Sequence, residues 1–209
     1  MAQESDQNQA NIVQLDDDQQ RQLIRIGKSP KANQRLRIPK RFVGKSLENF
    51  NDNADVISAS LASIDIGNGV FITGKCGTGK THLAIGLMLH WWADKWPDVH
   101  MAPLFIPSVE FFLELKSTFD NNQSEREVVQ RYTDAPLLVF DDLGAERISD
   151  WSRQQFSLII DRRYRDMRPI ILTSNLSLDD IAVKLDDRIA SRLVEMGAIV
   201  ELTGSDHRI

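Results

Sequence analysis

The chain has 209 residues, of which 42% are hydrophobic and 26% charged, and its formal net charge at pH 7 is −5. This composition predicts one globular domain and excludes a collagen-like, disulfide-stapled or wholly disordered protein. The single cysteine, Cys76, cannot form an internal disulfide, and the first residues lack the basic and apolar segments of a secretory signal. The apolar run at 83–89 is too short to span a membrane, so we expect a cytoplasmic protein without membrane contact.

The first 45 residues differ in charge from the rest of the chain. Residues 1–20 carry five acidic side chains, no basic ones and six glutamines, a composition that favours disorder. Residues 21–45 carry nine lysines and arginines and no acid. This basic stretch fits contact with a nucleic-acid backbone or an acidic partner surface, and it fits a solvated linker equally well. We therefore expect a flexible arm at 1–45 and a folded domain at 46–209.

Beyond residue 69, short β-branched runs alternate with longer helical segments. This alternation is typical of an α/β fold in which helices cover a parallel sheet. We expect strands at 70–73, 104–106, 137–140, 170–173 and 198–202. We expect helices at 80–96, 109–119, 125–132, 152–167 and 186–196.

A glycine-rich segment directly follows the strand expected at 70–73. Residues 74–81 read GKCGTGKT, which matches the phosphate-loop pattern G-x-x-x-x-G-K-[ST] between a strand and a helix. A chance match in a glycine-rich turn is the alternative, and the flanking strand and helix argue against it. In a phosphate loop, Lys80 would reach the β and γ phosphates of ATP and Thr81 would offer its hydroxyl to Mg²⁺. His82 is expected to pack beside the start of the helix, and neither it nor Cys76 is given a catalytic role. The expected nucleotide-binding residues are Gly74, Cys76, Gly77, Thr78, Gly79, Lys80, Thr81 and His82.

Two other expected strands end in polar side chains. Asp141 and Asp142 follow the apolar strand at 137–140, where carboxylates are costly unless a cation or water meets them. We assign Asp141 to Mg²⁺ and Asp142 to the water that attacks the phosphate, although Asp142 also begins a turn-like Asp-Leu-Gly segment. Asn175 follows the strand at 170–173 and would position water near the γ-phosphate, but Thr-Ser-Asn after a strand is also a common turn.

The order of these motifs resembles the AAA+ ATPases, and within them the DnaC/DnaI-type loaders of the replicative helicase, with the IstB transposition ATPases as close kin. The resemblance extends from about residue 38 to the C-terminus. The segments that carry it are 38–42, 47–50, 138–144, 161–164, 172–175 and 187–193.

The resemblance implies a three-layer AAA+ domain with sheet order 5-1-4-3-2, which hydrolyses ATP at the interfaces of a homo-oligomer. It implies that Asn175 is a sensor residue, and that Lys116 and Phe119 contact single-stranded DNA. Without the resemblance, Phe119 would be expected in the core and Lys116 in solvent.

The resemblance also implies that an arginine near the C-terminus reaches the γ-phosphate of the neighbouring subunit. Arg188 and Arg192 are four residues apart on an expected helix, so they share one face, and either fits this role. The alternative is a surface helix on which Arg188 pairs with Asp186 or Asp187.

Three departures from the family pattern shape the expected function. Asp142 stands where many AAA+ proteins have glutamate, and the sixteen residues after Leu193 are too few for a C-terminal helical lid or a DNA-reading helix-turn-helix. The N-terminal arm has no Cys or His cluster for a zinc-binding helicase-docking domain. We therefore expect an ATP-hydrolysing helicase loader in DNA replication, encoded by a phage or prophage. The alternatives are an IstB-like transposition helper and a nucleotide-gated adaptor with little turnover.

Overall fold

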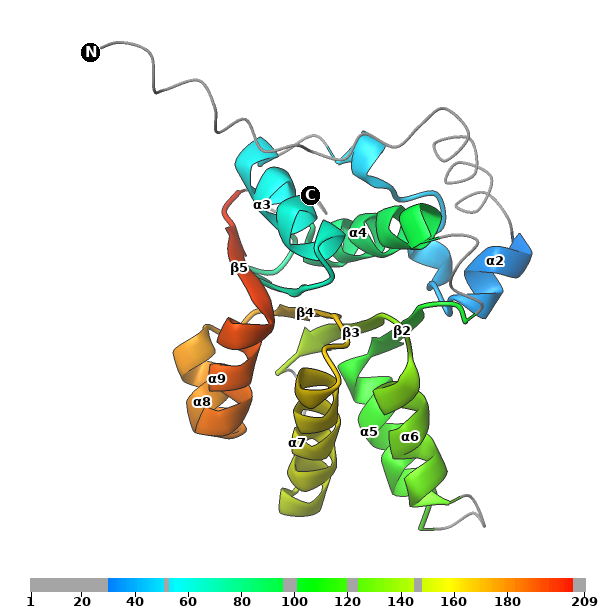
Figure 1. Ribbon diagram of the computed structural model, residues 1–209, viewed down its shortest axis with the longest axis vertical. Coiled ribbons are helices and arrows are strands. Elements are labelled where there is room, and N and C mark those ends of the chain that lie inside the picture. The colour runs from blue at the N-terminus through cyan, green and yellow to red at the C-terminus, as the bar shows by residue number, and fades with distance from the viewer. Residues whose placement is uncertain (1–29, 51–52, 96–100, 120–123, 145–147, 205–209) are drawn as a thin grey trace.

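The computed structural model describes residues 30–50, 53–95, 101–119, 124–144 and 148–204. Its centre is a parallel sheet of five strands in the order β2-β3-β4-β1-β5 (Figure 1). The strands are β1 (Gly69–Gly74), β2 (Leu104–Pro107), β3 (Leu138–Leu143), β4 (Ile170–Ser174) and β5 (Gly197–Leu202). All five expected strands and the expected order are confirmed.

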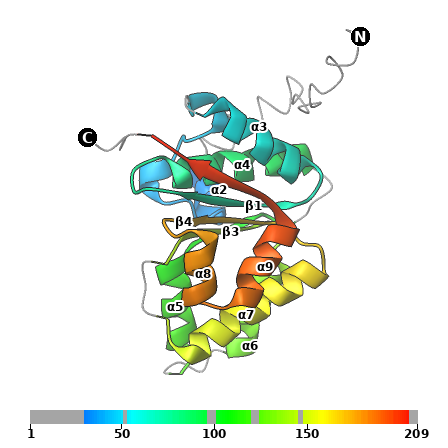
Figure 2. The same cartoon turned by 90° about the vertical axis from the view of Figure 1, so that its left-hand side faces the viewer.

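Helices cover both faces of the sheet. The helices α3 and α4 lie on one face, and α5 to α9 lie on the other (Figure 1, Figure 2). Their bounds are α3 (Ala54–Asp65), α4 (Lys80–Lys95), α5 (Ser108–Ser117), α6 (Glu125–Asp134), α7 (Asp150–Arg165), α8 (Leu178–Lys184) and α9 (Asp187–Met196). This is the three-layer arrangement that the alternation of strands and helices predicts.

Successive strand residues enter opposite layers of the core. Val70 and Ile72 of β1 belong to the cluster beneath α3 and α4, whereas Phe71 belongs to the cluster beneath α5 to α9. Ile171 in β4 and Ala198 in β5 lie opposite Val70 in the parallel register. Because both faces are buried, the inner strands β1, β3 and β4 read as largely continuous apolar runs.

The helices expected at 80–96, 109–119, 125–132, 152–167 and 186–196 are present as α4, α5, α6, α7 and α9. Neither α3 nor α8 is among the expected helices. Serines interrupt the apolar pattern of α3, where Ser60 Oγ donates to Val56 O and Ser63 Oγ donates to Gly69 O. The seven residues of α8 begin at a capping box in which Ser177 and Asp180 exchange hydrogen bonds.

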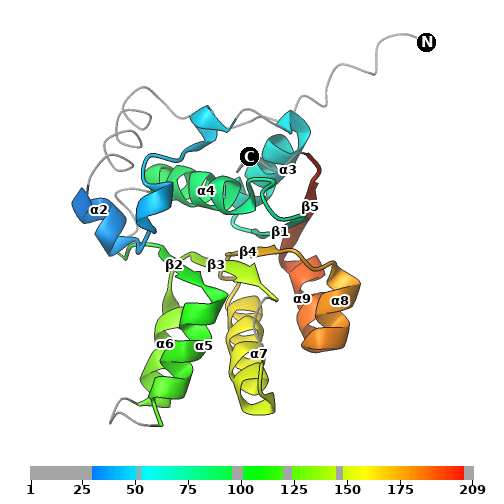
Figure 3. The same cartoon turned by 180° about the vertical axis from the view of Figure 1, so that it is seen from behind.

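The expected boundary at residue 45 is not where the core begins. The segment before it contains α2 (Pro30–Arg35) and a short 3-10 helix, η1 (Lys40–Phe42), and a second one, η2 (Leu47–Asn49), follows. Leu36 and Ile38 are buried in the same cluster as α4, and the Phe105 backbone N–H of β2 donates to Leu36 O at 3.4 Å. Figure 3 shows α2 beside β2 at this edge of the sheet. Residues 1–29 of the expected arm, including Arg21, Arg25 and Lys28, lie outside the described residues.

None of the helices within the described ranges is long and apolar enough to cross a membrane.

Candidate functional site

The glycine-rich segment forms a tight loop between β1 and α4. Gly74, Gly77 and Gly79 have φ values of 147°, 83° and 94°, a region that side chains disfavour. A Cβ atom on Gly74 would lie 2.4 Å from Leu202 O, and one on Gly79 would lie 2.9 Å from the Phe50 ring. The loop therefore requires glycine for both its turn and its close packing, and its backbone is free to approach a phosphate group.

The Lys80 side chain folds back into this loop. Lys80 is buried, and its Nζ donates to Gly74 O and Lys75 O, each at 2.8 Å. Thr78 Oγ1 donates to Lys75 O at 2.9 Å, which closes the loop further. An ammonium group is thus held where the loop backbone converges.

Thr81, Asp141 and Thr173 meet at the carboxyl ends of the strands. Thr81 Oγ1 lies 3.0 Å from each carboxylate oxygen of Asp141, and Thr173 Oγ1 donates to Asp141 Oδ1 at 2.6 Å. Thr173 also accepts a hydrogen bond of 2.8 Å from the Asp142 backbone N–H. Because β3 and β4 are parallel neighbours, their polar ends lie at the same edge of the sheet as the glycine loop.

Asp141 is only 7% exposed. Burial raises its pKa above the usual value, the hydroxyls of Thr173 and Thr81 act in the opposite direction, Asp142 raises it further and Lys80 lowers it. The effect of burial on the pKa is larger than that of the hydrogen bonds, so the surroundings do not fully compensate the negative charge of the ionised carboxylate. Such a group is suited to a cation.

Asp142 differs from its neighbour in both exposure and backbone. It is exposed and has a φ of 59°, a left-handed conformation that aspartate tolerates better than most residues. Because the chain turns here, two adjacent carboxylates have different surroundings, one buried against hydroxyls and one open to solvent.

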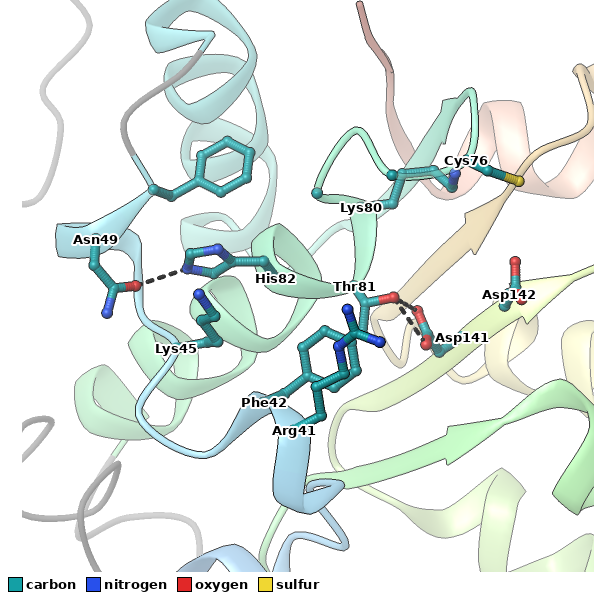
Figure 4. Close-up of a pocket in the computed structure, with 13 residues that line it drawn as sticks. Arg41, Phe42, Lys45, Asn49, Cys76, Lys80, Thr81, His82, Asp141 and Asp142 are labelled. Carbon is teal, nitrogen blue, oxygen red and sulfur yellow. Dashed lines mark hydrogen bonds between the residues drawn. The ribbon is translucent and has the colours of Figure 1, made fainter. Parts of the chain in front are cut away.

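These groups line one pocket of about 620 Å³ (Figure 4). The loop and strand ends contribute Cys76, Gly77, Gly79, Lys80, Thr81, His82, Asp141 and Asp142. The segment at 41–50 contributes Arg41, Phe42, Lys45, Asn49 and Phe50. None of this second set is an expected site residue, and Arg41, Phe42 and Lys45 fall within the expected flexible arm. The family motifs at 38–42 and 47–50 are the signal in the sequence that points to this segment.

His82 connects the two sides of the pocket. Its Nε2 lies 2.7 Å from Asn49 Oδ1 and 2.9 Å from Ser46 O, and its ring packs edge-on against Phe50 at 5.1 Å. His82 therefore packs beside the start of α4, as expected, and fixes η2 against that helix.

Asn175 lies outside the pocket lining. It is exposed directly after β4, and a Cβ on Gly144 would lie 3.6 Å from its Oδ1. It shares the sheet edge with Asp142.

The two candidate arginines have different surroundings. Arg192 forms an ion pair with Asp161 of α7, and its guanidinium lies 5.8 Å from the centre of the Tyr164 ring. Arg188 is exposed, and within the described ranges neither Asp186 nor Asp187 forms an ion pair with its side chain. Asp186 instead accepts from the Arg188 backbone N–H at 2.7 Å and caps α9.

The two residues expected to contact DNA are both exposed. Lys116 is in solvent, and Phe119 is 69% exposed with its ring 4.6 Å from the Trp151 ring at the start of α7. The interpretation of Phe119 as a core residue is therefore wrong, because the chain leaves α5 just before it and turns away from the sheet.

The pocket fits a nucleotide with Mg²⁺. The loop offers its backbone N–H groups and the Lys80 ammonium to phosphates. Thr81 and Asp141 offer oxygen ligands of the kind that Mg²⁺ binds together with phosphate and water. In the described part of the chain, no cluster of three or more His, Cys, Asp or Glu could hold a metal by itself. A metal here would share its coordination with the phosphates.

Comparison with known proteins agrees with this geometry. A family model described as IstB-like ATP binding protein matches residues 18–209. The phage-like element PBSX protein XkdC of Bacillus subtilis (strain 168) is 28% identical over 134 residues, which are 62% of this chain and 47% of that protein. The replicative helicase loader DnaC of Escherichia coli (strain K12) is 27% identical over 122 residues, 58% of this chain and 48% of that protein.

A crystal structure of the DnaC helicase loader superimposes with a TM-score of 0.67 at 27% identity, covering 79% of this chain and 100% of that chain. This superposition confirms the AAA+ type of fold. The chain spans about half the length of the curated relatives it matches. Because the family model covers nearly all of the chain, including the glycine loop and the ends of β3 and β4, the chain belongs to the family of IstB-like ATP-binding proteins.

Proposed function

We propose that the chain binds ATP with Mg²⁺ and hydrolyses it to ADP and phosphate. The observation that carries this proposal is one pocket that holds the glycine loop, the Lys80 ammonium and the Thr81–Asp141 pair. Bound Mg²⁺ would supply positive charge that neutralises and orients the phosphates. Lys80 would exchange its two loop carbonyls for phosphate oxygens, and Thr81 and Asp141 would hold the metal directly or through water.

Asp142 and Asn175 are proposed to handle the attacking water. Asp142 is an exposed carboxylate in the same pocket as Lys80, so it is open to the attacking water, whereas the Asp141 carboxylate is buried against the hydroxyls of Thr81 and Thr173. Asn175 follows the neighbouring strand and would orient that water through its amide. Aspartate is one methylene shorter than the glutamate common at this position, so we expect slow hydrolysis.

Arg188 is the arginine that we propose to act in a neighbouring subunit. Arg192 is already engaged with Asp161 and Tyr164, and releasing it would break this ion pair between α9 and α7. Arg188 is exposed on the same helix and would reach a second copy at no such cost. An arginine supplied in this way accelerates phosphoryl transfer about a thousandfold or more, because it meets charge that develops in the transition state.

The biological role that we propose is that of a cytoplasmic loader of the replicative DNA helicase. The likeness to DnaC, in both sequence and fold, supports this role, and the likeness to a phage-like element protein supports a phage or prophage origin. The rival is an IstB-like transposition helper, which the name of the family favours. A nucleotide-gated adaptor with little turnover is the other alternative, and the short Asp142 side chain favours it.

We further propose that single-stranded DNA contacts the end of α5. Phe119 presents most of its ring to solvent and is supported from behind by Trp151, so an unpaired base can stack on it. Lys116 lies within one helical turn and would meet a phosphate of the same strand.

The test is association with the host replicative helicase. The tagged chain is incubated with purified helicase, without nucleotide, with ADP or with a non-hydrolysable ATP analogue, and Lys80→Ala serves as the matched control. We expect ATP-dependent retention of the helicase by the wild type alone, together with phosphate release whose specific rate rises with protein concentration. Retention of an IS21-type transposase in place of the helicase would support the rival, and retention without any phosphate release would support the adaptor.

A further inference from the structure

The wall of the pocket that faces the glycine loop comes from the basic segment before β1. Two of its cations, Arg41 and Lys45, line the same pocket as Lys80. The pocket therefore has three cations against two carboxylates, Asp141 and Asp142, and two of the three cations come from this segment. A triphosphate needs positive charge beyond the single lysine of the loop.

This wall is fixed in place by the fold. Asn49 ties it together, because its Nδ2 donates to Gly44 O at 2.8 Å while its Oδ1 accepts from the Ser46 backbone N–H at 2.9 Å. Leu47 packs so closely on α4 that a Cβ on Gly86 would lie 2.8 Å from its side chain. The side chains that the wall presents are therefore held at a defined position relative to the phosphate loop.

Arg41 is directed at the metal end of the pocket. It is exposed on η1, and in Figure 4 its side chain extends towards the Thr81–Asp141 pair. Among the residues that the structure describes, no hydrogen bond or ion pair engages its guanidinium. A planar guanidinium binds two phosphate oxygens at once, which an ammonium does not do.

We propose that Arg41 binds the terminal phosphate of the nucleotide from within the same subunit and so makes the pocket prefer ATP to ADP. This inference rests on the proposed nucleotide site. It also divides the basic segment by function, because Arg41 faces the nucleotide pocket and is not part of a surface for DNA or an acidic partner.

The experiment measures the affinity of the full chain for a non-hydrolysable ATP analogue and for ADP, each with Mg²⁺, by calorimetry. Arg41→Ala should weaken binding of the ATP analogue about tenfold or more and of ADP less than about threefold, since a charge-assisted contact to one phosphate is lost. Arg41→Lys keeps the charge but not the contact to two phosphate oxygens, so its affinity for the ATP analogue should lie between those of the wild type and Arg41→Ala. Lys40→Ala is the matched control, because Lys40 is exposed on the same 3-10 helix but does not line the pocket.

Equal affinities in Arg41→Ala and Lys40→Ala would overturn the inference, and so would equal losses for the ATP analogue and ADP. Loss of single-stranded DNA binding in Arg41→Ala with unchanged nucleotide affinity would assign Arg41 to DNA. Failure of the wild type itself to bind either nucleotide would refute the proposed function, a result distinct from a failure at Arg41 alone. Thermal unfolding of each variant shows that it is folded, and the exposed Arg41 makes a loss of folding unexpected.

Discussion

Asp141→Asn should make the protein more stable in the absence of nucleotide and metal. Asp141 is a buried carboxylate whose two hydroxyl partners, Thr81 and Thr173, are neutral. An asparagine keeps both contacts, because its carbonyl accepts from Thr173 and its amide donates to Thr81. The substitution removes a buried charge without leaving a polar group unpaired.

The size of the effect follows from two opposing contributions. Desolvation of a buried carboxylate costs several kcal/mol, and each hydrogen bond from a hydroxyl to the charge returns about 1.5–3 kcal/mol. Burial is the larger contribution, since it is the main cause of the raised pKa of Asp141. We therefore expect a gain on the order of 1 kcal/mol, which corresponds to about 2–4 °C in Tm for a protein of this size.

The gain should depend on pH in a defined direction. With its pKa raised in the folded state, Asp141 takes up a proton on folding as the pH falls, which relieves the buried charge in the wild type. The advantage of Asp141→Asn should therefore be full at neutral pH and shrink on acidification towards the ordinary carboxyl pKa.

Thermal unfolding of the wild type, Asp141→Asn and Asp142→Asn measures these effects. Asp142 is exposed, so its variant should change stability by less than about 0.5 kcal/mol. With Mg²⁺ and ATP at about 100 times Kd, the wild type should gain about 2.7 kcal/mol, while Asp141→Asn should gain less and lose its advantage. A lower Tm for Asp141→Asn without ligand, or an equal response of both proteins to Mg²⁺ and ATP, would refute the reasoning.

Three further predictions concern other parts of the molecule. Arg163→Ala should lower the free energy of unfolding by about 3–5 kcal/mol in denaturant titrations, because its buried guanidinium donates to the carbonyls of Tyr132, Thr133, Ala135 and Pro169; a loss as small as that in Arg162→Ala would contradict this. Arg188→Ala should bind ATP normally, hydrolyse it about a thousandfold or more slower and regain activity when mixed with Lys80→Ala, whereas full activity of the variant alone would exclude its role in a neighbouring subunit. Lys116→Ala with Phe119→Ala should weaken single-stranded DNA binding at low salt by about 1–3 kcal/mol per stacked base with an unchanged Tm, and unchanged DNA affinity would remove α5 from the DNA surface.

The strands and the phosphate loop could be predicted because each has a local cause. Runs such as Val70-Phe71-Ile72 are apolar on both sides, as a buried parallel strand requires. The glycines of the Gly74–Thr81 pattern determine the backbone conformation of the loop, and Lys80 and Thr81 are the first two residues of α4. The meeting of Thr81 with Asp141 follows from topology, because parallel strands end at one edge.

The second wall of the pocket could not be predicted because its position depends on tertiary packing. The basic charges around Arg41 suggest a solvated arm, but Leu36 and Ile38 anchor that arm in the core. Spacing along α9 could not separate Arg188 from Arg192 either, since only the partner on α7, Asp161, distinguishes them. In each case a contact between residues far apart in sequence decided the role of a charged side chain.

The central claim is that this pocket binds ATP with Mg²⁺. Calorimetric measurement of ATP binding to the wild type and to Lys80→Ala, with and without Mg²⁺, tests it most directly. Lys80 is the ammonium that the glycine loop surrounds, so its removal leaves the phosphates without their main counter-charge. We expect the wild type to bind ATP saturably and more tightly with Mg²⁺, and Lys80→Ala to lose about a hundredfold or more in affinity. Affinity of Lys80→Ala near that of the wild type would contradict the assignment of this pocket to a nucleotide.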